Sequence, residues 1–138
     1  MNRIFATTYS EIIELFKTHK RIAITGYPGA GKTLLSTMVR SRAVIHTDHY
    51  LKLPRDKIAT QIMTDLSTKG KYVVEGTQIP KMLSQGFQPD VVIWLIGGTR
   101  PNCQGIRTQM QTYMAEYKGN VTKINLRDAQ DNPFVKRL

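Results

Sequence analysis

A glycine-rich stretch near the N-terminus, GYPGAGKT at residues 26–33, contains the residue types that bind phosphate groups. It matches the pattern G-x-x-x-x-G-K-[ST] at every fixed position. Glycines let backbone N–H groups converge on phosphate oxygens, and a helix after the loop adds the positive end of its dipole. We therefore predict a phosphate-binding loop formed by Gly26, Pro28, Gly29, Ala30, Gly31, Lys32, Thr33 and Leu34.

Two side chains of this loop have specific chemical roles. Lys32 supplies a mobile positive charge for the outer phosphates, and the Thr33 hydroxyl is a ligand for Mg²⁺. The alternative is an ordinary glycine turn, which the expected strand before the loop and helix after it argue against. The chain has no Asn-Lys-x-Asp motif of the guanine-specific kind, which favours ATP over GTP as the bound nucleotide.

Two acidic residues close short apolar runs further along the chain. Asp48 ends AVIHTD at 43–48, and Glu75 is followed by glycine in KYVVEG at 71–76. Phosphoryl transfer needs a Mg²⁺ ion tied to the protein and a group that orients the attacking oxygen. If the strand containing Glu75 lies beside the strand that precedes the loop, Glu75 can hold Mg²⁺ through water. Asp48 would lie farther out, where it can accept the proton of an acceptor hydroxyl.

The elements that must position these residues alternate along the chain. Apolar runs predict strands at 21–26, 43–48, 71–76, 90–98 and 121–126. Helical patterns predict helices at 8–20, 32–42, 54–70, 79–86 and 103–120. Such alternation is typical of an α/β fold with a parallel sheet that is covered on both faces. Ligands of these sheets bind beyond the carboxyl ends of the strands, where the candidate residues are expected.

The combination of GYPGAGKT, HTDHY and VVEG resembles the small P-loop kinases, over about residues 21–126. Nucleoside kinases of the uridine-kinase type have an aspartate and then an aromatic residue after the second strand, over the acceptor. Polynucleotide 5′-kinases of phage have a similar Asp-x-Tyr arrangement, which Asp48 and Tyr50 match. The length of 138 residues predicts a single domain over 1–138. The resemblance implies a three-layer sandwich whose five-stranded parallel sheet has the order 2-3-1-4-5, with the predicted strands counted along the chain.

The resemblance also implies a role for each matched residue. Lys32 would contact the β- and γ-phosphates, Thr33 would bind Mg²⁺, and Asp48 would be the catalytic base. Glu75 would contact the water around Mg²⁺. This last role matters because the predicted strand at 90–98 has no acidic residue at its end, where related enzymes often have one.

Kinases of this type usually also have a lid with arginines that close on the transferring phosphate. The candidate lid is the segment 98–119, in which Arg100 and Arg107 are the candidate catalytic arginines. For each of them, a solvated charge on the surface is the alternative.

Residues after the second predicted strand are candidates to contact the acceptor. We expect His49 and Tyr50 on the substrate side, where Tyr50 either stacks on a base or packs in the core. Lys52 and Arg55 either bind an acceptor phosphate or nucleic-acid backbone, or are plain surface charges. His46 and His49 bracket an aspartate, but side chains along a strand alternate between faces, so we expect no metal other than Mg²⁺ there.

Composition limits the class of partner and the compartment. Twenty Lys and Arg residues against ten Asp and Glu give a net charge of +10. This charge favours a polyanionic partner, and a basic surface that keeps the protein soluble is the alternative. The apolar runs are far shorter than the ~20 residues of a membrane span, so we expect no membrane partner. The N-terminus lacks the apolar centre of a secretory signal, and Cys103 is the single cysteine, which together predict a cytoplasmic protein.

These observations predict a kinase that uses ATP and Mg²⁺ to phosphorylate a hydroxyl on a nucleic-acid-related acceptor. The positive charge favours a polynucleotide 5′-hydroxyl or a hydroxymethylated base in DNA, and a free nucleoside or nucleotide is the other form of acceptor. Two other classes of function stay open: a nucleic-acid-stimulated ATPase, and a nucleotide-binding module without turnover.

Overall fold

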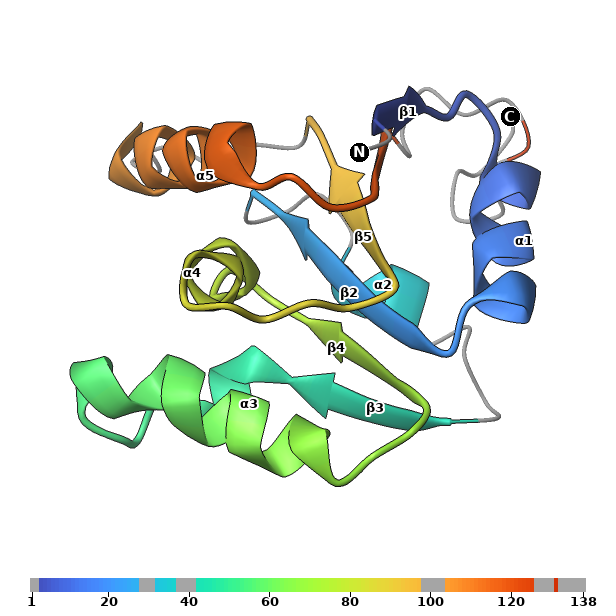
Figure 1. The fold of residues 1–138 in the computed structure, drawn as a ribbon. Helices are drawn as coiled ribbons and strands as arrows, with labels where there is room; N and C mark the ends of the chain where they lie inside the picture. Colours follow the sequence, from blue (N-terminus) through green and yellow to red (C-terminus); the bar gives the residue numbers. More distant parts are fainter. Residues whose placement is uncertain (1–2, 28–31, 37–41, 98–103, 126–130, 132–138) are drawn as a thin grey trace.

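The computed structural model describes residues 3–27, 32–36, 42–97, 104–125 and 131 of the chain (Figure 1). Strands and helices alternate along it, and two short 3₁₀ helices (η1 and η2) follow the third strand. In chain order the elements are β1 (Arg3–Phe5), α1 (Tyr9–Thr18), β2 (Arg21–Gly26), α2 (Lys32–Ser36), β3 (Ala43–His46), η1 (Thr47–Tyr50), η2 (Arg55–Lys57), α3 (Ile58–Ser67), β4 (Tyr72–Glu75), α4 (Ile79–Ser84), β5 (Val91–Leu95), α5 (Gln104–Glu116) and β6 (Val121–Ile124). No helix in these described ranges is long and apolar enough to cross a membrane.

The strands form one parallel sheet in the order β1-β6-β5-β2-β4-β3. This sheet confirms the α/β class, but the predicted five-stranded sheet was wrong: six strands are present among the described residues, and the order differs from the prediction by the additional strand β1. Among the described strands, β1 lies at the edge and pairs with β6 alone. It has three residues, too few for a periodic pattern, and Ile4 and Phe5 in it are 57% and 60% exposed.

Strand β4 lies between β2 and β3. Glu75, its last residue, is in register with Ile24 of β2 and with His46 of β3. Because β2 ends at Gly26, the acidic end of β4 and the beginning of the phosphate-binding loop lie at the same edge of the sheet. This is the neighbour relation on which the expected position of Glu75 depended.

Helices cover both faces of the sheet, in agreement with a three-layer sandwich (Figure 1). The core on one face joins α3, α4 and α5 to the sheet and includes Ile62, Met82, Trp94, Met110 and Met114. The core on the other face joins α1 and α2 to the sheet and includes Ile12, Phe16, Ile22, Leu35 and Ile93. Covering both faces explains why the strands read as nearly continuous apolar runs.

Several elements are shorter than predicted, and one difference concerns the site. The second predicted strand, 43–48, ends at His46, so Asp48 lies in η1 rather than at the end of a strand. Within the described residues, strand β3 pairs with β4 alone, and their paired register ends at His46 and Glu75. The predicted helix at 54–70 likewise divides into η2 and α3.

Distant segments hold both ends of α1. The Asp131 carboxylate accepts hydrogen bonds from the backbone N–H groups of Tyr9 and Ser10, at 2.6 and 3.0 Å, at the start of this helix. At its end, the Arg42 guanidinium donates to the carbonyl oxygens of Phe16 and His19. The negative group at the N-terminus and the positive group at the C-terminus both complement the helix dipole.

Candidate phosphate-binding and acceptor site

The segment predicted to bind phosphate, residues 26–33, begins at the end of β2 and ends in α2, which is the strand–loop–helix context that the motif requires. Lys32 begins α2, and its ammonium donates hydrogen bonds to the carbonyl oxygens of Gly26, at 3.0 Å, and Tyr27, at 3.1 Å. The side chain thus reaches back over the beginning of the loop. A phosphate oxygen carries negative charge and is a stronger acceptor for an ammonium group than a carbonyl oxygen. Lys32 can therefore exchange these carbonyl partners for a phosphate.

Part of the predicted loop lies outside the described residues. This applies to Pro28, Gly29, Ala30 and Gly31, and to the side chains of Thr33 and Leu34. Their predicted contacts with the nucleotide therefore stay predictions.

Two hydrogen bonds attach the beginning of the loop to neighbouring elements. The buried Thr25 hydroxyl donates to the carbonyl oxygen of Gly76, at 3.0 Å, and so joins the ends of β2 and β4. The Gln111 amide of α5 donates to the Tyr27 hydroxyl, at 3.2 Å. These contacts fix the base of the loop between the strand that carries Glu75 and helix α5.

Glu75 is 3% exposed and pairs with His46 at the ends of the neighbouring strands β4 and β3. Oε1 of Glu75 lies 2.7 Å from Nδ1 of His46. An ionised carboxylate only accepts hydrogen bonds, so with Glu75 ionised Nδ1 must carry the proton of this contact. Sequence reasoning missed this pairing of His46 with Glu75.

The backbone after Glu75 requires glycine. Gly76 has a φ of 146°, and a Cβ at this position would come 1.7 Å from the Thr47 Oγ1 atom. Thr47 is fully buried, and its hydroxyl has no hydrogen-bond partner within the described part of the chain. The close approach of Gly76 and Thr47 brings the start of η1, and hence Asp48, against the end of β4.

The residues of η1 have different surroundings. Asp48 and His49 are exposed, and no ion pair joins Asp48 to another described residue. Its carboxylate is therefore accessible to a substrate. The Tyr50 hydroxyl instead donates to the Asp65 carboxylate of α3, at 2.6 Å, while the Tyr50 ring packs against the core. Burial, with a further contribution from Asp65, raises the pKa of Tyr50 to about 12.

A cavity of about 500 Å³ lies at the carboxyl end of β4, and Arg55 of η2 lines it. Its other lining residues are Thr77, Gln78, Pro80, Lys81, Gln109, Met110 and Tyr113. Lys52 is exposed and does not line this cavity. Two cations and two amide side chains thus surround a space next to the strand that carries Glu75. We call it the acceptor cavity.

Sequence reasoning missed most residues of the acceptor cavity. Thr77 and Gln78 come shortly after β4, so the expectation that ligands bind beyond the carboxyl ends of strands, which selected Asp48, would also have selected them. Lys81 lies in the following helix, α4. Gln109 and Tyr113 reach the cavity from α5, which no local sequence signal predicts.

Of the candidate lid, 98–119, the structure describes the backbone from 104 onward, and this part is mainly α5. Met110 and Met114 of α5 are buried in the core. Arg100 lies outside the described residues, and so does the side chain of Arg107. Whether these arginines serve a lid stays a prediction.

The donor set suits a nucleotide-bound Mg²⁺ better than a metal held by protein alone. No group of three or more His, Cys, Asp or Glu side chains that could hold a metal occurs in the described ranges. Mg²⁺ in nucleotide sites keeps several waters and uses one or two protein ligands besides the phosphates. Glu75 beside the loop fits such a site, together with the predicted ligand Thr33.

Comparison with known proteins gives no further guide, because no protein-family model, curated protein or solved structure matches this chain. The function must therefore be inferred from the loop between β2 and α2, from Glu75 on the adjoining strand, and from the acceptor cavity.

Proposed function

We propose that this protein is a P-loop kinase that uses ATP and Mg²⁺ to phosphorylate a hydroxyl on a nucleic-acid-related acceptor. One observation carries the proposal: the G-x-x-x-x-G-K-[ST] segment connects β2 to α2, while β4 lies beside β2 and ends in the buried Glu75. If the segment were an ordinary glycine turn, there would be no reason for a buried acidic residue at the end of β4, the neighbouring strand in the sheet.

The residues of the site divide the work of phosphoryl transfer. Bound Mg²⁺ neutralises charge on the β- and γ-phosphates, and Thr33 and Glu75 would hold it, Glu75 through water. Lys32 binds the outer phosphates in place of the carbonyl oxygens that it contacts in this structure. These residues hold the triphosphate in position and stabilise its charge.

Asp48 acts on the acceptor. Its exposed carboxylate accepts the proton of the acceptor hydroxyl while the hydroxyl oxygen forms a bond to the γ-phosphorus. The bond between the γ-phosphorus and the bridging oxygen breaks, and ADP leaves. Asp48 later releases the proton to water.

The acceptor cavity suggests what kind of molecule is phosphorylated. Its volume of about 500 Å³ lies within the ~300–1,000 Å³ of small-molecule sites. Arg55 and Lys81 in its lining favour an acceptor that carries phosphate. The net charge of +10 favours DNA or RNA over a free nucleotide.

Transfer of labelled phosphate from γ-³²P-ATP tests the proposal. The acceptors are nucleosides, nucleoside monophosphates, single- and double-stranded DNA and RNA, and hydroxymethylated DNA. Label on any of them supports the kinase, and label on a polynucleotide supports the favoured acceptor. Labelled free phosphate with no labelled acceptor would contradict the kinase and favour an ATPase, and no turnover at all would favour a binding module.

A further inference from the structure

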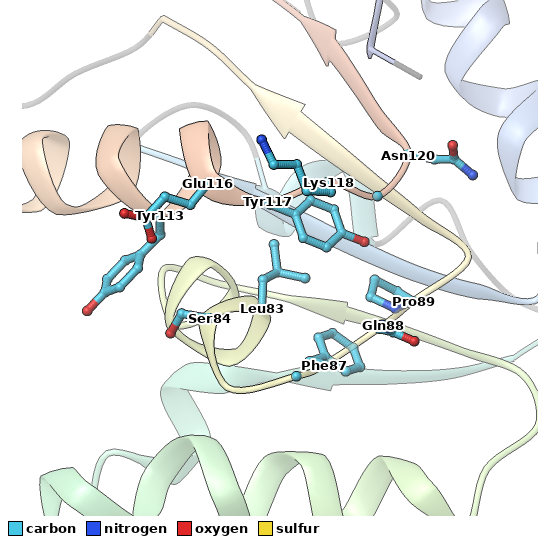
Figure 2. Close-up of a pocket in the computed structure, with 12 residues that line it drawn as sticks. Leu83, Ser84, Phe87, Gln88, Pro89, Tyr113, Glu116, Tyr117, Lys118 and Asn120 are labelled. Carbon is cyan, nitrogen blue, oxygen red and sulfur yellow. The ribbon is translucent and has the colours of Figure 1, made fainter. Parts of the chain in front are cut away.

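A second cavity, of about 630 Å³, lies between α4 and α5 at the opposite end of the sheet (Figure 2). Residues that precede β5, among them Phe87, and residues that precede β6, among them Lys118 and Asn120, line it. It therefore opens at the amino ends of the strands, away from the phosphate-binding loop. No step of the proposed reaction uses it.

The two cavities share one wall. Tyr113 of α5 lines both. On α5, Gln109 lines the acceptor cavity and Tyr117, just past the helix, lines the second cavity, so the lining residues follow one another at helical spacing. On α4 the same progression leads from Lys81 to Ser84. The two cavities therefore follow one another along α4 and α5, from the carboxyl end of the sheet to its amino end, and we call them together the α4–α5 groove.

We propose that this α4–α5 groove, bordered by Lys81, Ser84, Gln109, Tyr113 and Tyr117, binds a single strand of nucleic acid. Its end would occupy the acceptor cavity, and the following nucleotides would extend into the second cavity. The chemical fate of that end rests on the proposed function, whereas binding in the groove does not.

Aromatic side chains in the groove suit unpaired bases. Figure 2 shows the ring of Tyr117 within the second cavity, above Leu83 and Phe87. Gly119 allows this position, because a Cβ there would come 2.1 Å from the Tyr117 hydroxyl oxygen. Bases of single strands stack on such rings with little sequence preference, whereas the bases of a duplex are already stacked on one another. The groove therefore favours a single strand over a duplex.

The charged side chains of the groove suit a phosphate backbone. Arg55 and Lys81 line one cavity and Lys118 lines the other, while Glu116 is the single acidic residue among the described residues of the two linings. Cations are thus available at both ends of the groove. The negative charge of Glu116 would repel a phosphate backbone, although its oxygens can accept hydrogen bonds from the amino groups of bases.

The length of the groove sets the expected footprint. From Gln109 to Tyr117 is about 12 Å at ~1.5 Å per residue. At the ~3.4 Å rise per nucleotide of a stacked strand, this corresponds to at most roughly three to four nucleotides, and to fewer for a more extended strand. Affinity should therefore increase from one nucleotide to about four and change little for longer strands.

Fluorescence anisotropy in the absence of ATP tests the groove. The probe is a single-stranded oligonucleotide with a 5′-hydroxyl and a 3′-fluorescein, and unlabelled strands of one to about eight nucleotides compete with it. Tyr117→Ala should weaken binding about tenfold, as expected for the loss of one stacked base. Lys118→Ala should reduce the slope of log affinity against log salt by about 0.7, as expected for one lost phosphate contact. Glu116→Gln should strengthen binding.

Matched controls come from surfaces away from the groove. Phe5→Ala removes an exposed aromatic ring on β1, and Lys17→Ala removes an exposed charge on α1. Neither should change affinity or salt slope, and circular dichroism should show that all variants are folded. Three results would overturn the proposed binding of a single strand in the groove. They are equal binding of duplex and single strand, an affinity that does not depend on strand length, and equal effects of Tyr117→Ala and Phe5→Ala.

The two proposals fail in different ways. Strands that bind through Tyr117 and Lys118 but receive no phosphate would support the groove and contradict the kinase. Phosphate transfer to a free nucleoside by a protein that binds no oligonucleotide would support the kinase and overturn the groove.

Discussion

Nδ1 of His46 lies 2.7 Å from Oε1 of Glu75, and this contact joins the ends of β3 and β4 beside β2, which leads into the predicted phosphate-binding loop. Glu75 is 3% exposed, and a buried carboxylate is costly unless a hydrogen bond or a charge compensates it. His46 provides this compensation and fixes one oxygen of the carboxylate. The other oxygen is then the one with which Glu75 can contact water or Mg²⁺.

His46→Ala should lower the free energy of unfolding by roughly 1–3 kcal/mol, because it leaves the buried Glu75 without this partner. Adding Glu75→Gln should recover part of this loss, since a neutral amide is less costly to bury than an unpaired carboxylate. Urea denaturation of the wild type, both single variants and the double variant measures the coupling. Strictly additive effects would show that the contact contributes nothing to stability.

Gly76→Ala should destabilise the protein by at least about 2 kcal/mol, because backbone strain adds to a steric conflict with the buried Thr47. The φ of 146° and the 1.7 Å approach of a Cβ to Oγ1 are the two causes. Gly70→Ala is the matched control, since a Cβ there meets nothing within 4 Å and the backbone φ is ordinary. Thermal denaturation should show a large decrease in Tm for the first variant and little change for the second.

The sequence predicted the elements that carry the loop and Glu75, because strands covered on both faces read as apolar runs bounded by glycine or charge. VVIWL in β5 and VV in β4 are such runs. Strand β1 was missed because three residues at an exposed edge have no such pattern. Asp48 was predicted at the end of a strand but lies in η1. A local sequence pattern does not show that the pairing of β3 with β4 ends at His46.

The contacts between elements were harder to predict. The pairing of His46 with Glu75 depends on the register of β3 against β4, which no local motif records. The two cavities depend on how α5 packs against α4, and only the assembled core brings Gln109 and Tyr113 opposite Lys81. Sequence reasoning therefore found the residues of the motif and missed most of the residues that line the acceptor cavity.

Asp131 should stabilise the protein at neutral pH and lose this effect in acid. Hydrogen bonds from the Ser10 side chain and the Tyr9 backbone hold the pKa of Asp131 below its ordinary value of 3.8. Because the folded-state pKa is depressed, the contribution is complete above about pH 4 and is lost as the pH falls through the lower, folded value. The difference in Tm between wild type and Asp131→Ala should therefore be largest near neutral pH and decrease below pH 4. A difference that grows in acid would contradict the contact.

Tyr50 should titrate well above an ordinary tyrosine. Burial and the Asp65 carboxylate raise its pKa from 10.0 to about 12. Because the folded-state pKa is raised, the stability that Tyr50 contributes is complete below about pH 10 and is lost as the pH rises through about 12. Tyr50→Phe should lower the free energy of unfolding by about 0.5–1.5 kcal/mol at neutral pH. In an absorbance titration of the tyrosines, this variant should lack the absorbance change of one tyrosine in the part of the curve above pH 10. If the missing change instead lies near pH 10, the hydrogen bond between Tyr50 and Asp65 is refuted.

Asp48→Asn should separate chemistry from nucleotide binding. An exposed carboxylate that accepts the proton of the acceptor contributes to the transfer step and not to the affinity for ATP. At saturating ATP, this variant should transfer phosphate roughly 100- to 10,000-fold more slowly and bind ATP as the wild type does. Asp56→Asn, on the neighbouring η2, is the matched control and should change neither quantity.

Lys32→Ala should instead weaken ATP binding, because the Lys32 ammonium is the charge expected to contact the outer phosphates. Calorimetry with ATP and transfer from γ-³²P-ATP measure the two quantities, and an Asp48→Asn protein of unchanged turnover would remove Asp48 from the role of base.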